Sequence, residues 1–344
     1  MKYIGNKTRL LDFIYDSMCD FGIPMKGVFF DIFGGTGSVG RFFKEKGFRI
    51  ISNDFMTYSF IHQYVTVKMN KMPVFTSVSN DGICGVLDYL NNLEPKRGYA
   101  FENYAPSGRY NRQYFSDMNA MKIDSIRDQI EDWKNEGKIS QEEYYVLVCS
   151  LVNAADFVAN ISGTYGAYLK IWRSMALKQL TLLPPSISDN NCDNEIYQTD
   201  ANELIKRVDA NVLYLDPPYN ERQYAPNFHV LESLSVWDKM ELKGKTGQRD
   251  YSKTKSLYCL KREAGAAFEN LIENAKAECI VLSYNNEGII PREDLIRILS
   301  KKGHVKEYTT DYRRFRTESD NEHRQYKKCD DKVIEHLYIV KVNS

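Results

Sequence analysis

The segment Val212-Leu213-Tyr214-Leu215-Asp216-Pro217-Pro218-Tyr219 joins a short apolar run to an acid, two prolines and an aromatic ring. Four consecutive apolar residues are typical of a buried strand in a parallel sheet. The two prolines end the strand, because neither can donate a hydrogen bond to a neighbouring strand. Asp216 and Tyr219 are therefore expected at the carboxyl end of a central strand, where open α/β sheets bind their ligands.

The turn after this strand also has a chemistry of its own. It leaves the carbonyl groups of Asp216 and Pro217 free to accept hydrogen bonds. An amino group on a planar base needs two acceptors for its hydrogens and a flat partner for its face, and the tetrapeptide can supply all three. A simple strand-ending turn explains the two prolines but not the acid before them or Tyr219 after them.

Asp216-Pro217-Pro218-Tyr219 resembles the catalytic motif of the DNA methyltransferases that modify the exocyclic nitrogen of adenine. The resemblance implies that Asp216 and the Pro217 carbonyl hold the target amine. It also implies that Tyr219 stacks on a base that has been flipped out of the duplex. The expected catalytic residues are Asp216, Pro217, Pro218 and Tyr219.

A glycine-rich loop marks the second informative region. The expected elements are a strand over 28–33, the loop Gly34-Gly35-Thr36-Gly37-Ser38-Val39-Gly40, a helix over 41–46 and a strand over 48–52. With Asp54 at the end of the second strand, they form one mononucleotide-binding unit. The glycines also fit the dinucleotide fingerprint, so a nicotinamide-dependent enzyme or a non-catalytic nucleotide-binding module stays an alternative. Asp54 would bind ribose hydroxyls in either case.

The residues before the glycines favour a different cofactor. Asp31 and Phe33 precede Gly35 and Gly37 in the order Asp-x-Phe-x-Gly-x-Gly, which resembles the form seen in methyltransferases. The resemblance implies that this loop binds S-adenosylmethionine, that Phe33 lines its pocket and that Asp31 attracts its ammonium group. Together with residues 216–219, this pattern favours S-adenosylmethionine over NAD.

Two further segments are similar to cofactor contacts of the same family. Residues 2–7 resemble a Lys-aromatic-x-Gly-x-Lys segment that lies against the methionine end of S-adenosylmethionine, which implies that Tyr3 and Lys7 contact the cofactor. An ordinary polar lead-in to a helix is the alternative. An acid at the position of Asp200 reaches the adenine ring of the cofactor in the family, while a helix N-cap explains the same residue equally well.

The alternation of strand and helix stops between residues 55 and 188, which predicts an inserted, mainly helical subdomain. Ser140 and Glu143 form the signature of a capping box at the start of an apolar helix. A basic stretch, 243–262, has seven Lys or Arg and a single acid. Arginines, lysines and tyrosines in such segments suit contact with phosphates and bases, although solvated loops and packed tyrosines are the alternative. The candidate DNA contacts are Arg109, Arg112, Tyr165, Lys170, Arg222, Tyr224, Lys245 and Arg249.

Composition sets limits on these expectations. The chain of 344 residues has 46 Lys or Arg and 46 Asp or Glu, so DNA binding has to depend on local basic patches. No apolar stretch is long enough for a membrane span, and the amino terminus lacks the apolar core of a signal peptide. Seven cysteines without a Cys-x-x-Cys pair favour a reducing cytoplasm and argue against a structural metal.

The order of the motifs resembles the alpha class of adenine-specific DNA methyltransferases, of the Dam and FokI type. The resemblance implies an α/β, Rossmann-like S-adenosylmethionine-dependent methyltransferase sheet with an inserted, mainly helical DNA-recognition subdomain. The expected domains are 1–55 with 190–344 for catalysis and 56–189 for target recognition. The implied reaction is methyl transfer to adenine in double-stranded DNA by base flipping, in a restriction-modification system with a cognate restriction endonuclease. RNA adenine and a protein amide remain alternative substrates.

Overall fold

The computed structural model describes residues 7–313 and 332–343. These residues form two compact units. The sheet unit contains the described residues of 4–55, 190–223 and 255–344, and the helical unit contains 56–189 and 224–254. The helical unit thus includes 224–254 in addition to the expected insertion, because the helix at 229–236 packs against two helices of that unit. In the described part of the chain, no helix has the length and apolar character that a membrane crossing requires.

Seven strands form a single sheet within the described residues, in the order β3-β2-β1-β4-β5-β7-β6. Their bounds are β1 (Val28–Asp31), β2 (Arg49–Asn53), β3 (Glu195–Tyr197), β4 (Asp209–Leu215), β5 (Lys276–Asn285), β6 (Gly303–Arg313) and β7 (Lys332–Val342). The first five strands are parallel, whereas β7 runs antiparallel to both β5 and β6. The expected α/β, Rossmann-like fold is confirmed.

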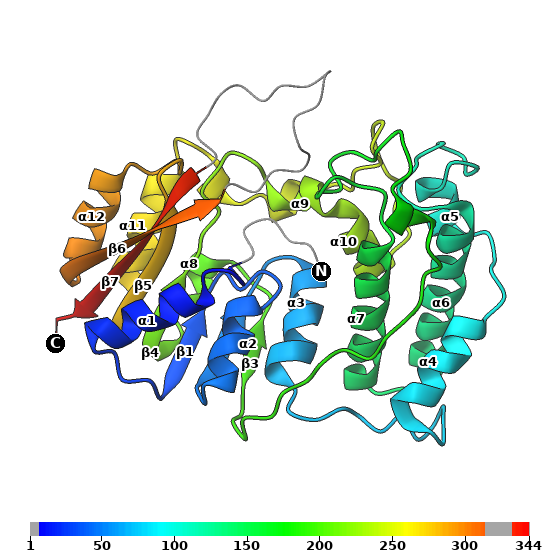
Figure 1. The fold of residues 1–344 in the computed structure, drawn as a ribbon, viewed down its shortest axis with the longest axis horizontal. Helices are drawn as coiled ribbons and strands as arrows, with labels where there is room; N and C mark the ends of the chain where they lie inside the picture. The colour runs from blue at the N-terminus through cyan, green and yellow to red at the C-terminus, as the bar shows by residue number, and fades with distance from the viewer. Residues whose placement is uncertain (1–6, 314–331, 344) are drawn as a thin grey trace. The chain divides into compact units, whose positions relative to one another are not determined.

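Helices cover both faces of this sheet (Figure 1). Their bounds are α1 (Leu11–Phe21), α2 (Ser38–Glu45), α8 (Ala201–Leu204), α11 (Ala264–Asn274) and α12 (Arg292–Ser300), with the 3₁₀ turn η4 (Leu257–Cys259). On one face, alternate strand residues such as Phe30 and Leu213 pack with α8, α11 and α12. On the other face, the ring of Phe29 stacks on Phe43 of α2 with the ring centroids 4.1 Å apart. Since strand side chains alternate between faces, the parity of a position predicts which helices it meets.

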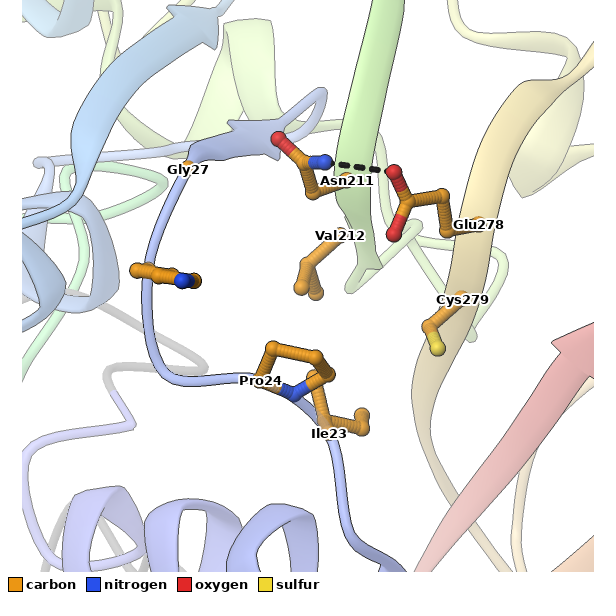
Figure 2. A pocket seen from close by; sticks show the side chains of 8 residues that line it. Ile23, Pro24, Gly27, Asn211, Val212, Glu278 and Cys279 are labelled. Carbon is orange, nitrogen blue, oxygen red and sulfur yellow. Dashed lines mark hydrogen bonds between the residues drawn. The ribbon is translucent and has the colours of Figure 1, made fainter.

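A pocket of about 350 Å³ lies at the amino-terminal edge of the sheet (Figure 2). Asn211 of β4 and Glu278 of β5 line it and are joined by a hydrogen bond of 2.6 Å. The Asn211 side chain also accepts a hydrogen bond from the amide of Val28, so it fastens β4 to β1. This edge is opposite to the carboxyl ends at which the sequence places the catalytic and cofactor residues.

The named elements of the helical unit are all helices or helical turns. Their bounds are α3 (Thr57–Gln63), the π-helical turn η1 (Tyr64–Lys68), α4 (Gly82–Asn92), α5 (Tyr99–Tyr104), α6 (Asp117–Asn135), α7 (Gln141–Phe157), η2 (Ser174–Leu177), α9 (Tyr224–Asn227), α10 (His229–Val236) and η3 (Ser252–Thr254). The predicted capping box at the start of α7 is confirmed, because Ser140 and Glu143 exchange both hydrogen bonds. Most of the large apolar side chains of α6 are buried, but Met118, in the first turn, is 59% exposed.

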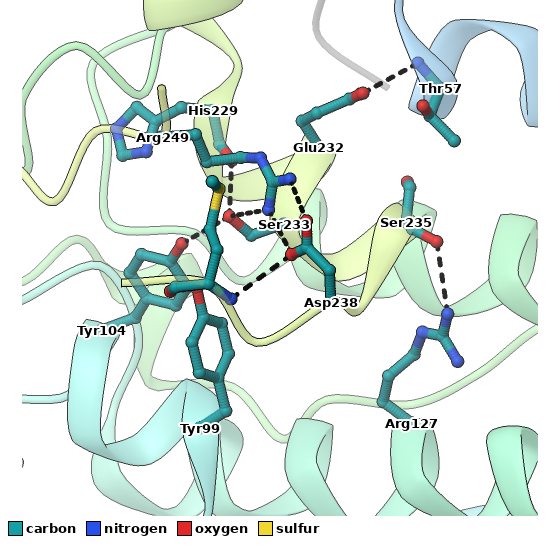
Figure 3. A network of polar contacts seen from close by, with 11 residues as sticks. Thr57, Tyr99, Tyr104, Arg127, His229, Glu232, Ser233, Ser235, Asp238 and Arg249 are labelled. Atoms are coloured by element: carbon teal, nitrogen blue, oxygen red, sulfur yellow. Dashed lines mark hydrogen bonds and ion pairs between the residues drawn. The ribbon is translucent and has the colours of Figure 1, made fainter. Parts of the chain in front are cut away.

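Buried polar side chains connect the helices of this unit (Figure 3). Glu232 of α10 accepts hydrogen bonds from the amides of Thr57 and Tyr58, and so caps the start of α3. Tyr104 donates to the hydroxyl of Ser233, which lies on α10 as well. The Glu232 contacts satisfy backbone groups that the start of α3 would otherwise leave without partners, and the Tyr104 contact ties α5 to α10.

Candidate functional site

Asp31 and Asp216 occupy equivalent positions at the carboxyl ends of neighbouring strands. Asp31 is the last residue of β1, Asp216 directly follows β4, and these two strands pair with each other in parallel. Both acids have the parity of Phe29 and Tyr214, whose rings stack 5.8 Å apart on the face covered by α2. The structure therefore brings the glycine loop and residues 216–219 to the same edge of the sheet, as the sequence predicts.

The glycine loop between β1 and α2 has the backbone conformation that its residues suggest. Gly35 and Gly37 have φ angles of 52° and 74°, in the left-handed region that favours glycine. The Gly35 amide donates to Oδ2 of Asp54 over 3.0 Å, so the acid after β2 supports the loop directly. Gly37 is the N-cap of α2, and the first turn of that helix contains no acid. The loop thus presents a helix N-terminus and backbone amides at the edge of the sheet.

Asp31 is a buried carboxyl whose charged neighbours among the described residues are acids. It is 1% exposed, and within the described residues neither of its oxygens has a hydrogen bond of normal geometry. Burial, reinforced by the nearby charges of Asp216 and Asp54, raises the pKa of Asp31 well above its usual range. An unpaired buried acid of this kind is ready to receive a cationic group.

Lys7 is the cation nearest to the catalytic motif in the described chain. Its side chain is 3% exposed, and its ammonium group lies 3.3 Å from Oδ1 of Asp216 and 3.5 Å from Oε2 of Glu335. The same ammonium group lies 5.3 Å from the centre of the Tyr219 ring. Lys7 therefore pairs with two carboxylates of this chain, and its contact with a cofactor stays a prediction.

Asp216 is held between opposing electrostatic effects. The pKa of Asp216 is raised to about 6, because burial and the charge of Glu335 raise it more than the ammonium group of Lys7 lowers it. The side chain is 15% exposed, so a ligand can reach it. Near neutral pH the carboxyl is mostly ionised and can accept hydrogen bonds.

Tyr219 is fixed at its backbone and leaves part of its ring open. Its carbonyl accepts a hydrogen bond from the amide of Ile289 over 2.9 Å. Its ring meets the ring of Tyr284 edge-on, with the centroids 5.8 Å apart. The residue is only half-buried, which leaves part of the ring available for a planar ligand.

Phe33 packs against an aromatic ring, whereas Asp200 caps a helix. Phe33, in the glycine loop, packs edge-on against Tyr258 at 5.0 Å. Asp200 caps α8 by accepting hydrogen bonds from the amides of Asn202 and Glu203, so the helix-cap alternative describes its contacts. Tyr3 lies outside the described residues.

The eight candidate DNA contacts separate by exposure. Arg109, Lys170 and Lys245 in the helical unit are exposed, as is Arg222 in the sheet unit, and Tyr224 at the start of α9 is half-buried. The other three side chains direct their polar groups to partners inside the helical unit; they are Arg112, Tyr165 and Arg249.

Arg112 organises the basic loop instead of presenting its own charge. It is 2% exposed and donates to the carbonyls of Asn103, Gly244 and Lys245. Arg249 makes a two-pronged ion pair with Asp238, at 2.9 and 2.7 Å.

Tyr165 is fully buried and donates to Asp156 over 3.0 Å. The ring of His229 contacts the Tyr165 carbonyl at 2.9 Å, and burial lowers the pKa of His229 to about 4. These contacts make both residues part of the interior of the helical unit.

Glu335 is the site residue that sequence reasoning missed. It lies on β7, is 4% exposed and pairs in register with Asn285 at the end of β5. An acid within the mostly apolar segment 333–342 was the available signal. Only the strand order, with β7 inserted beside β5, shows that this acid reaches Lys7.

The chain belongs to the family described as D12 class N6 adenine-specific DNA methyltransferase, whose model matches residues 3–298. It is 39% identical over 343 residues to the type II methyltransferase M.NlaIII of Neisseria lactamica, an alignment that covers 99% of each chain.

Two longer enzymes are similar over part of their length. The type II methyltransferase M.FokI of Planomicrobium okeanokoites is 40% identical over 94% of this chain and 50% of its own length. The modification methylase StsI of Streptococcus sanguinis is 41% identical over 88% of this chain and 46% of its own length. The chain thus spans about half the length of these two relatives.

Proposed function

We propose that this protein transfers a methyl group from S-adenosylmethionine to the exocyclic amino group of adenine in double-stranded DNA. The observation that carries the proposal is the pair of neighbouring strand ends, with Asp31 and the glycine loop after β1 and Asp216 to Tyr219 after β4. A cofactor and a planar amine bound at these two ends would meet at one edge of the sheet.

The residues present fit S-adenosylmethionine. Asp31 offers an unpaired buried carboxyl, which suits the ammonium group of the cofactor. Asp54 supports the glycine loop at the edge where a ribose would lie, and Phe33 offers a ring at the same edge. When bound, the cofactor supplies a methyl group made electrophilic by its sulfonium.

The chain itself positions and polarises the amine. Asp216, ionised near neutral pH, accepts one amino hydrogen, and the Pro217 carbonyl accepts the other. Pro218 keeps the turn rigid. Tyr219 stacks on the base and fixes its plane, a contact worth about 1–3 kcal/mol per base. Catalysis by such a site is mainly a matter of orientation and electrostatics.

Exposed cations of both units are proposed to contact DNA phosphates. Arg109, Lys170 and Lys245 serve this role in the helical unit and Arg222 in the sheet unit. Arg112 supports it indirectly, because it holds the carbonyls of the loop that carries Lys245. The similarity to type II methyltransferases favours a restriction-modification system with a cognate endonuclease that acts on the same site.

The test is transfer of labelled methyl from S-adenosylmethionine to unmethylated genomic DNA, followed by analysis of the nucleosides. We expect label in N6-methyladenine, and none with Asp216→Asn, which should still bind the cofactor. Label in methylcytosine would contradict the base assignment. Label only in RNA or in protein added as competitor would redirect the substrate, and preferential binding of NAD would overturn the methyltransferase assignment.

A further inference from the structure

The ammonium group of Lys7 lies between two carboxylates that come from opposite ends of the chain. Asp216 follows the central strand β4, and Glu335 lies on β7, beyond the residues matched by the family model. Glu335 is 4% exposed, and Lys7 is its one ion-pair partner among the described residues. Loss of its single partner would leave the buried acid with an uncompensated charge, so the acid and its partner fix each other's position.

We infer that Glu335 is a positioning residue for methyl transfer, which acts through Lys7 by sharing its charge and so keeping the Asp216 carboxylate available to the target amine. The inference rests on the proposed function of Asp216. Its geometric basis is parity: Glu335 and Asp216 lie on the face of the sheet that α1 and α2 cover, and Lys7 lies in the segment that leads into α1 at Leu11.

The sharing matters because Lys7 affects Asp216 in two ways. Its charge favours the ionised carboxyl, which the amine requires as an acceptor. A closer, exclusive ion pair would instead hold the carboxylate toward Lys7 through its buried Oδ1 and weaken it as an acceptor for the amino hydrogen. Glu335 draws the ammonium group toward β7 and prevents this. The charged and titratable groups that face Asp216 are Lys7 from the amino-terminal segment, Asp31 from β1, Tyr214 from β4 and Glu335 from β7, with Tyr219 beside Lys7.

The test is the pH dependence of the single-turnover rate of methyl transfer for the wild type, Glu335→Gln, Glu335→Asp and Lys7→Met. In the wild type, the rate should fall on the acid side as Asp216 is protonated. Glu335→Gln removes a negative charge near Asp216, so its acid limb should move down by about one pH unit, and its plateau should fall roughly tenfold. Lys7→Met should move the limb upward. Glu335→Asp keeps the charge and should restore the wild-type limb in large part.

Glu307→Gln is the matched control. Glu307 lies on the neighbouring strand β6 and pairs with Arg292 and His336, away from Lys7. Its acid limb should coincide with that of the wild type. Thermal unfolding of each variant separates a loss of folding from a change in titration. An acid limb in Glu335→Gln that coincides with that of the wild type would overturn the inference.

A second readout separates this inference from the proposed function. The Asp216 carboxyl can be titrated by carbon-13 NMR of labelled aspartate, with Asp216→Asn for its assignment. A wild type that transfers no methyl to DNA would contradict the proposed function, while the pKa of Asp216 in Glu335→Gln would still decide the inference. A lower pKa supports it, and an unchanged pKa overturns it.

Discussion

Asp31 and Asp216 have the same chemistry, and their surroundings give them different properties. Both carboxyl groups are buried at neighbouring strand ends, and burial alone raises the pKa of each. Lys7 offsets this effect at Asp216, whereas the groups nearest to Asp31 are themselves acids. Asp216, with a pKa of about 6, is therefore an acceptor near neutral pH, whereas the pKa of Asp31 is raised with no cation to oppose the shift. Two acids with separated pKa values can serve different functions in one site.

Cofactor binding should release a proton from Asp31. In the free protein the pKa of this carboxyl is raised by burial and by neighbouring acids, and the arrival of an ammonium group would lower that pKa. The affinity for S-adenosylmethionine should then increase as the pH rises. Calorimetry in two buffers of different ionisation enthalpy measures the proton directly.

Asp31→Asn should abolish this release and weaken binding by roughly tenfold or more, since a hydrogen bond to a charged group is worth about 1.5–3 kcal/mol. Asp209→Asn, an exposed acid at the other end of β4, is the control and should leave both quantities unchanged. Equal proton release by the wild type and by Asp31→Asn would contradict the assignment of Asp31.

At the scale of the elements, helix α10 holds the helical unit together through buried polar contacts. Arg127 of α6 is fully buried and donates to the carbonyls of Leu234 and Ser235 at the end of α10. It also pairs with Glu131 and Tyr144. Two carbonyls at a helix end would lose their donor if this side chain were removed.

Arg127→Leu should lower the free energy of unfolding by about 3 kcal/mol or more, because it leaves buried acceptors without donors. Lys134→Leu replaces an exposed cation on the same helix and should cost less than about 1 kcal/mol. Denaturant unfolding followed by circular dichroism compares the two variants. Equal stability of the two would show that the Arg127 contacts add no net stability.

At the scale of the whole molecule, equal numbers of acids and bases make local charge decisive. The net charge of zero provides no general attraction to DNA, so binding has to depend on exposed basic side chains such as Lys245. Lys245 lies in a loop closed by paired backbone bonds between Lys243 and Gln248, and Arg112 anchors this loop from beneath. The buried arginine thus fixes the position of the exposed lysine.

Lys245→Ala should weaken DNA binding by a similar factor for all sequences, because a phosphate contact carries no base information. The slope of log K against log salt concentration should become shallower by about one. Fluorescence anisotropy with specific and unrelated duplexes at several salt concentrations measures both effects. Lys206→Ala, an exposed lysine paired with Glu203 in the sheet unit, should leave the slope unchanged. An unchanged slope in Lys245→Ala would remove this residue from the DNA-binding surface.

Much of the sheet unit follows from local pattern. The apolar runs, the glycine loop and the two prolines predicted strands, turns and their order, because each depends on residues close in sequence. The same reasoning placed Asp31 and Asp216 at one edge, since the carboxyl ends of parallel strands meet there. The capping box of α7 was predictable for the same local reason.

The partners of the charged side chains were decided by packing. The pattern of the sequence made Arg112, Tyr165 and Arg249 equal candidates with Lys245, and only burial separates them. Glu335 meets Lys7 across 328 positions of the chain, because β7 lies beside β5 and directs this acid to the face that α1 covers. Motifs are local and could be recognised in the sequence. Ion pairs and burial depend on which strands are neighbours, so the folded chain alone determines them.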